Sequence, residues 1–265
     1  MRLLKIPAIV LVVLLMGPLL QAFGGEAPVQ RGWQFANRDS TGMAPKPADF
    51  AGAIIQIYAA RTYSWRGHLA VHTWVATKAA GADHYLVHQV IGFRERRGLD
   101  VRVSEADEPD RNWYGNAPEL LVDIRGDEAA QLLPRVLAAV ESYPYPSSYT
   151  MWPGPNSNTF TAHVGREVPE LGLVLPVTAI GKDYLPGGAL IAATPSGSGF
   201  QFSVLGALGL TAAVDEGFEF NVLGLSTGID FKRPALKIPG VGRIGMQAVP
   251  STNRDQAINK SGIER

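Results

Sequence analysis

The hydrophobic positions of the chain begin with a continuous run from Ile6 to Leu20 that only proline and glycine interrupt. Arg2 and Lys5 precede this run, and a charged start followed by an apolar stretch is typical of a secretory signal. We therefore predict that residues 1–24 form a signal peptide or, if they are not cleaved, an anchor helix in the inner membrane. Because positive charges stay in the cytoplasm, both alternatives predict a periplasmic or otherwise extracytoplasmic protein of the cell envelope.

Alternating apolar positions replace this pattern after a polar segment rich in glycine and proline, residues 25–50, which we interpret as a linker. Within 68–77, for example, Val71 and Thr73 fall on one face of a strand, and His72 and Trp74 fall on the other. The strands predicted in this way cover residues 54–58, 68–77, 85–93, 99–103 and 120–124.

Helical periodicity follows the strands. A first helix begins near Asp127, with acidic residues in its first turn, and Pro134 is expected to kink or restart it. A second helix is predicted from about Ser157 to Glu167, after a turn rich in proline. Strands followed by helices favour an α+β domain, here residues 51–190, in which an antiparallel sheet packs on helices.

A glycine-rich region, residues 191–248, carries an internal repeat in which GFQFSVLG (199–206) recurs as GFEFNVLG (217–224). The turn signal between the two copies predicts a long antiparallel hairpin that pairs 199–212 with 217–229. This β-hairpin extension either completes the sheet or presents an apolar surface to a membrane or a second molecule. Residues 249–265 are polar and are predicted to be a flexible tail.

Composition argues against several classes of partner and chemistry. The chain of 265 residues has 24 basic and 24 acidic side chains and no long run of either sign, which argues against nucleic acid as a partner. The absence of cysteine excludes thiolate nucleophiles and cysteine-ligated metals. His68 and His72, like His84 and His88, are four residues apart, but on strands this spacing is ~13 Å. One histidine from each strand could still meet across the sheet, yet no acidic partner stands out, so we predict neither a metal nor a cofactor.

The string NSNTF (156–160) is the remaining candidate for chemistry, and its simplest interpretation is a helix cap made by Asn156 or Ser157. It belongs to a set of strings through which residues 56–184 resemble a bacterial family, the domain of unknown function 3750. That family has no established activity. The matching strings are AVHTW (70–74), LLVDIRG (120–126), YPY (143–145), WPGPNSNTF (152–160) and AIGKDY (179–184).

The order of these strings is also similar to that of circularly permuted papain-like hydrolases, the NlpC-type peptidases and lecithin–retinol acyltransferase relatives. The resemblance implies a histidine on an early strand, His72, and a nucleophile at a later helix start, where Ser157 replaces the family's cysteine. Serine is not ionised in advance at such a position, so His72 would have to remove its proton during attack. His88 would orient His72, and backbone N–H groups near Ser157 would bind the oxyanion.

We expect Asn156, Asn158, Trp152 and Trp74 to line the substrate side of this site, although a Trp beside Pro, such as Trp152, is more often a packing anchor. The leading function is then hydrolysis or acyl transfer at an amide or ester of an envelope component, such as a cell-wall peptide or a lipid. The alternative is a non-catalytic envelope-binding protein on the same scaffold. A third class is a protein whose hairpin inserts into the membrane or drives assembly. In each case the N-terminal segment is expected to supply the membrane contact. Separately, we expect Lys182 and Asp183 to form a surface ion pair.

Overall fold

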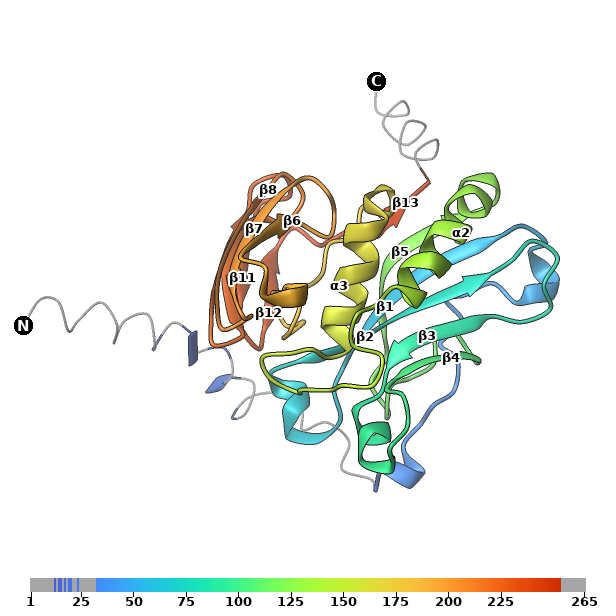
Figure 1. Ribbon diagram of the computed structural model, residues 1–265, viewed down its shortest axis with the longest axis horizontal. Coiled ribbons are helices and arrows are strands. Elements are labelled where there is room, and N and C mark those ends of the chain that lie inside the picture. Colours follow the sequence, from blue (N-terminus) through green and yellow to red (C-terminus); the bar gives the residue numbers. More distant parts are fainter. Residues whose placement is uncertain are drawn as a thin grey trace, which may run out of the picture.

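Two sheets with helix α3 (Ser157–Glu167) between them form the core of the computed structural model (Figure 1). The structure describes residues 32–253, together with residues 12, 14, 15, 17, 19, 20 and 23 of the N-terminal segment. The predicted α+β class is confirmed. The predicted export segment lies for most of its length outside the described residues. Among the residues that are described, no helix combines the length and the apolar character needed to cross a membrane.

The first sheet has six strands in the order β13-β5-β1-β2-β3-β4. All its pairs are antiparallel except that of β13 with β5. The five strands that the sequence analysis predicted between residues 54 and 124 are all present in this sheet, with ends shifted by a few residues. The strands are β1 (Ile54–Arg61), β2 (Val71–Lys78), β3 (Leu86–Val90), β4 (Arg102–Ala106), β5 (Glu119–Arg125) and β13 (Ser251–Thr252).

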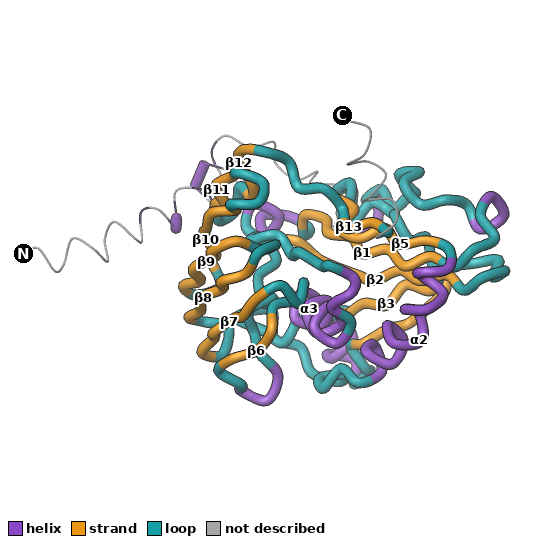
Figure 2. The backbone as a smooth tube through the Cα atoms, turned by 90° about the horizontal axis from the view of Figure 1, so that it is seen from above, coloured by secondary structure: helices purple, strands orange, loops and turns teal. Residues whose placement is uncertain are grey.

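One face of this sheet is covered by α3 and by α2 (Asp127–Glu141), as Figure 2 shows from above. The apolar stripe of α2, with Leu132 and Val136, is buried against the sheet. The helix runs through Pro134, so the expected restart there is wrong. Burial of the stripe on both sides of Pro134 offsets the backbone hydrogen bond that proline cannot donate.

The other face of the sheet is covered by residues 37–50, which the sequence analysis interpreted as a linker. Asp110 holds this segment in place, because its carboxylate accepts hydrogen bonds from Ser40 Oγ (2.7 Å) and from the backbone N–H of Met43 (2.6 Å). Met43 and Phe50 pack against the buried side chains of that face. The linker prediction is therefore wrong for this part of the chain, since one buried carboxylate fixes it to the domain.

The second sheet has seven strands in the order β12-β11-β10-β9-β8-β7-β6, all antiparallel. The predicted long hairpin is wrong, because each copy of the repeat is one strand of six residues, β7 or β9, with β8 between them. Leu223 and Gly224 have φ of 51° and 75°, so they close a two-residue turn at the end of the second copy. The strands are β6 (Ile191–Ala193), β7 (Gly199–Val204), β8 (Leu208–Ala213), β9 (Gly217–Val222), β10 (Leu225–Asp230), β11 (Ala235–Ile238) and β12 (Gly242–Gly245).

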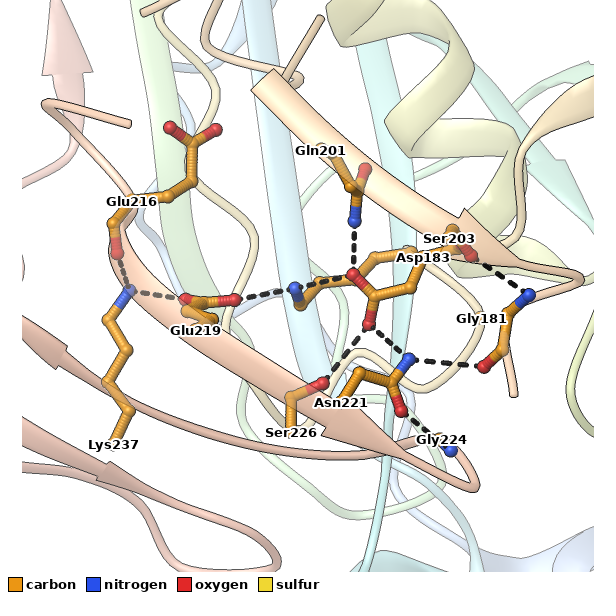
Figure 3. A network of polar contacts seen from close by, with 12 residues as sticks. Gly181, Asp183, Gln201, Ser203, Glu216, Glu219, Asn221, Gly224, Ser226 and Lys237 are labelled. Carbon is orange, nitrogen blue, oxygen red and sulfur yellow. Dashed lines mark hydrogen bonds and ion pairs between the residues drawn. The ribbon is translucent and has the colours of Figure 1, made fainter. Parts of the chain in front are cut away.

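A buried charged network joins this second sheet to the segment that follows α3 (Figure 3). Lys182 Nζ lies 3.1 Å from Asp183 Oδ1 and 2.7 Å from Glu219 Oε2, and Lys237 Nζ lies 2.6 Å from Glu219 Oε1. Burial would lower the pKa of Lys182, but the neighbouring carboxylates raise it above its usual value. The expected surface ion pair of Lys182 and Asp183 is therefore wrong, since both side chains are buried.

The chain returns to the first sheet at its C-terminal end. β13 pairs with β5, and Asn253 Nδ2 donates to the backbone carbonyl of Arg125 (2.6 Å). The predicted flexible tail thus begins too early, and its last part, residues 254–265, lies outside the described residues. Short 3-10 helices occupy several connections: η1 (Trp33–Phe35), η2 (Pro47–Asp49), η3 (Ser64–His68), η4 (Gly92–Arg97), η5 (Pro169–Leu171) and η6 (Pro186–Gly188).

Candidate functional site

The start of α3 is closed by a capping box. Asn156 Oδ1 accepts hydrogen bonds from the backbone N–H groups of Asn158 (2.9 Å) and Thr159 (3.2 Å). Thr159 Oγ1 accepts in return from the backbone N–H of Asn156 (3.2 Å). Ser157 is the first residue of the helix, as predicted, but Asn156 is its cap. Two of the expected oxyanion donors are thus already bound by the side chain of Asn156.

The amides of Asn156 and Asn158 also fasten the helix start to the rest of the domain. Asn156 Nδ2 donates to the carbonyls of Met151 (3.1 Å) and Ile180 (3.0 Å). Asn158 Nδ2 donates to the carbonyls of Ile180 (2.7 Å) and Val71 (3.0 Å). Each residue is only 3% exposed. Their polar groups are therefore used within the fold, in contrast to the expected role of contacting a substrate.

Ser157 lies at the junction of α3 and β2. Its backbone carbonyl accepts a hydrogen bond from Thr73 Oγ1 (3.3 Å), and the residue is 6% exposed. Within the part of the chain that the structure describes, no hydrogen bond reaches the Ser157 hydroxyl. The candidate nucleophile is therefore present at a helix N-terminus, but its neighbour on β2 is Thr73.

His72, the expected base, lies on the opposite face of the sheet. Successive side chains of a strand point to opposite faces, and Thr73 faces α3, so His72 faces away from it. His72 Nε2 is hydrogen-bonded to Gln89 Oε1 (3.0 Å), and the imidazole is stacked on Trp113 with ring centroids 3.8 Å apart. Burial lowers the pKa of His72 to about 4. The predicted pairing of His72 with Ser157 is therefore wrong, because the sheet lies between them.

His88, the expected orienting residue, is on β3 directly opposite Val75, a residue of the core cluster under α2 and α3. Its Nε2 contacts Thr77 Oγ1 (2.9 Å) and its Nδ1 contacts Ser104 Oγ (2.8 Å). Burial, helped by the charge of Arg102, lowers its pKa to about 4. His72 and His88 point to opposite faces of the sheet, so His88 does not orient His72. In the described ranges no three His, Asp or Glu side chains are grouped closely enough to hold a metal ion.

The two tryptophans expected near a substrate make structural contacts. Trp74 is 2% exposed, donates from Nε1 to the carbonyl of Pro109 (2.7 Å) and stacks on Tyr58. Trp152 donates from Nε1 to the carbonyl of Leu223 (2.8 Å) and remains 46% exposed. Trp74 is thus a core residue, and Trp152 anchors the turn between β9 and β10, which was the alternative interpretation of this side chain.

Sequence comparison agrees with the resemblance noted above. A family model described as protein of unknown function, DUF3750, matches residues 52–184, which include β1 to β5, α2 and α3. No curated protein matches the chain, and no solved structure matches it either.

Proposed function

Because this chain belongs to the DUF3750 family of proteins of unknown function, we propose its role from its own geometry: a non-catalytic protein of the cell envelope that binds an envelope component. The observation that carries this proposal is the separation of His72 from Ser157 by the six-stranded sheet. The scaffold offers a serine at a helix N-terminus, but the β2 side chain that contacts this residue is Thr73, through the Ser157 backbone carbonyl.

A serine hydrolase needs a base within hydrogen-bond reach of its nucleophile, because the hydroxyl must lose its proton during attack. His72 is hydrogen-bonded to Gln89 and stacked on Trp113. Its pKa of about 4 makes its imidazole a poor proton acceptor at neutral pH. Two of the expected oxyanion donors, the backbone N–H groups of Asn158 and Thr159, are already bound by Asn156.

Two further features support a binding role in the envelope. Arg2, Lys5 and the apolar run from Ile6 to Leu20 favour export. The second sheet carries many large apolar side chains that are at least one third exposed, among them Phe200 and Phe218. A surface of that kind, in a protein whose candidate nucleophile Ser157 is paired with no base among the described residues, favours binding over turnover.

One observation favours the hydrolase alternative. The Ser157 hydroxyl, at the start of α3, accepts and donates no hydrogen bond among the described residues, so it is free to react if another base reaches it. His88 is on the same face of the sheet as α3, but Thr77 and Ser104 occupy both its ring nitrogens. An amide or ester hydrolase, or an acyltransferase, would therefore need a rearrangement that frees His88.

The two alternatives are separated by a fluorophosphonate probe, which labels activated serines covalently, applied to the full chain. We expect no labelling at Ser157, while a known serine hydrolase in the same tube is labelled. Labelling that is lost in Ser157→Ala but kept in Ser142→Ala would overturn the proposal. Ser157→Cys gives a second readout, since it introduces the only thiol of the chain. Ester hydrolysis by this variant that disappears with His88→Ala would favour the hydrolase.

A further inference from the structure

The seven-stranded sheet has its polarity reversed with respect to an ordinary surface sheet. The side chains that point toward α3 are polar and buried, and those that point outward are large, apolar and exposed. Figure 1 shows α3 behind one face of this sheet, and no element on its other face is labelled. We call that side the outer face. Six of its residues are Phe200, Phe202, Leu210, Phe218, Phe220 and Ile229, which are 38–72% exposed.

The strand register makes these side chains neighbours. Phe202 pairs with Leu210, and Leu210 pairs with Phe220, so one apolar row crosses three strands. A second row continues from Phe218 through Ile229 to the far strands of the sheet. The charged residues of β9 to β12 belong to the inward set, which includes Glu219 and Lys237. The outer face is thus one contiguous apolar surface that no charge interrupts within the described strands.

Single exposed apolar residues are common on soluble proteins, but contiguous apolar patches of more than a few hundred Å² are rare and mark interaction sites. The inward face explains how this sheet remains folded without cover. Lys182, Glu219 and Lys237 form ion pairs beneath it, so the sheet is fixed from the polar side. The apolar side is therefore available to an apolar partner.

The apolar N-terminal segment lies beside this sheet. Leu14 is only 3% exposed, and Gly17 lies so close to β11 that a Cβ added to it would be 2.9 Å from Ile238 Cγ2. Gly17, a residue of the apolar run that the sequence analysis assigned to the membrane, therefore lies beside the end of β11. In the meander, the turns at Leu205 and Leu223 lie at the same end of the strands as Ile238.

The two ends of the sheet differ in charge. Leu205 and Leu223 are 55% and 58% exposed and mark an apolar end, next to the N-terminal contact. The opposite end carries the exposed ion pair of Lys232 with Asp215. An apolar face with an apolar end and a charged end has the polarity of a surface that lies at a lipid–water boundary.

A shallow apolar groove lies on the same side of the sheet. It has a volume of about 390 Å³, and its apolar lining residues are Ile229, Phe231, Pro234, Ala235, Leu236 and Ile244. An acyl chain is the apolar group that such an open groove accepts in a bilayer. Asp230 also lines the groove, and its carboxylate is paired with Arg243 (2.7 Å).

We propose that the outer face docks on the surface of a lipid bilayer, next to the apolar N-terminal segment, with the outward phenylalanines among the acyl chains. This inference deepens the proposed function, because it names a lipid surface as the envelope component that the chain binds. It predicts an orientation: the seven-stranded sheet faces the membrane and β4 of the first sheet faces water.

The absence of cysteine makes this orientation measurable in the full chain, since any cysteine introduced is the only site of labelling. Phe220→Cys and Phe202→Cys place a polarity-sensitive fluorophore on the outer face, and Glu105→Cys places it on an exposed position of β4. With vesicles of phosphatidylethanolamine and phosphatidylglycerol, we expect the emission at positions 202 and 220 to rise several-fold. Nitroxides on the acyl chains should quench it, and aqueous iodide should reach it several-fold less well. Position 105 should show none of these changes.

The three labelled chains carry the same N-terminal segment, so a difference between their labels reports the orientation and not the attachment to the vesicle. Equal iodide quenching of positions 202 and 220 with and without vesicles would overturn the proposal. Shielding of these positions without vesicles, rising with protein concentration, would also overturn it and identify a second copy of the chain as the occupant. Labelling of Ser157 by fluorophosphonate would remove the proposed non-catalytic role but leave the orientation intact, so the two failures are distinguishable.

Discussion

The hydroxyl of Thr73 lies 3.3 Å from the carbonyl oxygen of Ser157, and the imidazole of the preceding residue, His72, points to the other side of the sheet. Thr73 Oγ1 also lies 3.0 Å from Asn158 Oδ1 and 2.9 Å from Thr161 Oγ1. A papain-like enzyme would need an imidazole within hydrogen-bond reach of the Ser157 hydroxyl. Here the position holds a small hydroxyl that stabilises the helix start, which is why the geometry favours a scaffold over a catalyst.

The first prediction separates the two residues at the helix start. Asn156→Ala removes the cap of α3 and leaves the carbonyls of Met151 and Ile180 with fewer donors. We expect the free energy of unfolding to fall by about 2–4 kcal/mol. Ser157→Ala, the matched control, should change it by less than ~0.5 kcal/mol, since the hydroxyl has no partner among the described residues. Urea unfolding followed by circular dichroism measures both, and similar losses for the two variants would contradict the assignment of the cap.

The second prediction concerns the charged network under the seven-stranded sheet. Lys182→Met leaves the buried carboxylates of Asp183 and Glu219 with less compensation, so we expect a loss of about 3 kcal/mol or more. Lys232→Met removes an exposed partner of Asp215 and should cost less than ~1 kcal/mol. The measurement is again the free energy of unfolding in urea. If both variants lose the same amount, the network does not fix the sheet to the domain.

The local patterns of the first domain were sufficient to predict most of its elements. Helix α3 begins and ends at the predicted residues, because a proline-rich turn and an Asn cap define its start. Five of the six strands of the first sheet follow from alternation, and β13 does not. The same alternation already separates His72 from Thr73, so the faces of β2 were readable from the sequence. The sequence pattern did not indicate on which face of the sheet α3 would pack.

The sequence analysis predicted one hairpin where the second sheet has seven strands, and the reason lies in its turns. Two copies of one motif with a turn signal between them resemble the arms of one hairpin, but the Leu-Gly pair at the end of each copy turns the chain again. Positive φ at Leu205 and Leu223 is uncommon for leucine, so propensity alone does not indicate these turns. The burial of Lys182 was equally hidden, because its partner Glu219 is 37 residues away in the sequence.

The third prediction tests export, which the described residues leave as an expectation. The charged start and the apolar run of residues 2–20 should carry the domain across the cytoplasmic membrane. An alkaline phosphatase fused after Arg265 should therefore be active, and a reporter that works only in the cytoplasm should be inactive there. Replacing Leu14 and Leu15 by Glu should reverse both results, because charges in the apolar run oppose insertion. Activity of the cytoplasmic reporter in the unmodified chain would refute export.

The last prediction follows from the two buried histidines. Burial lowers the pKa of His72 and of His88 from 6.5 to about 4, so between these values the unfolded chain binds more protons than the folded one. The stabilising contribution is complete above pH 6.5 and is lost as the pH falls toward 4, by up to about 3 kcal/mol for each residue. His72→Gln, which cannot titrate, should flatten the fall in unfolding free energy over this range by roughly half, while lowering stability at neutral pH. His84→Gln, which changes an exposed ring paired with Asp83, should leave the slope as it is. Urea titrations at several pH values measure this slope. An unchanged slope in His72→Gln would mean that His72 is already charged in the folded chain. That outcome would contradict its burial and its stacking on Trp113.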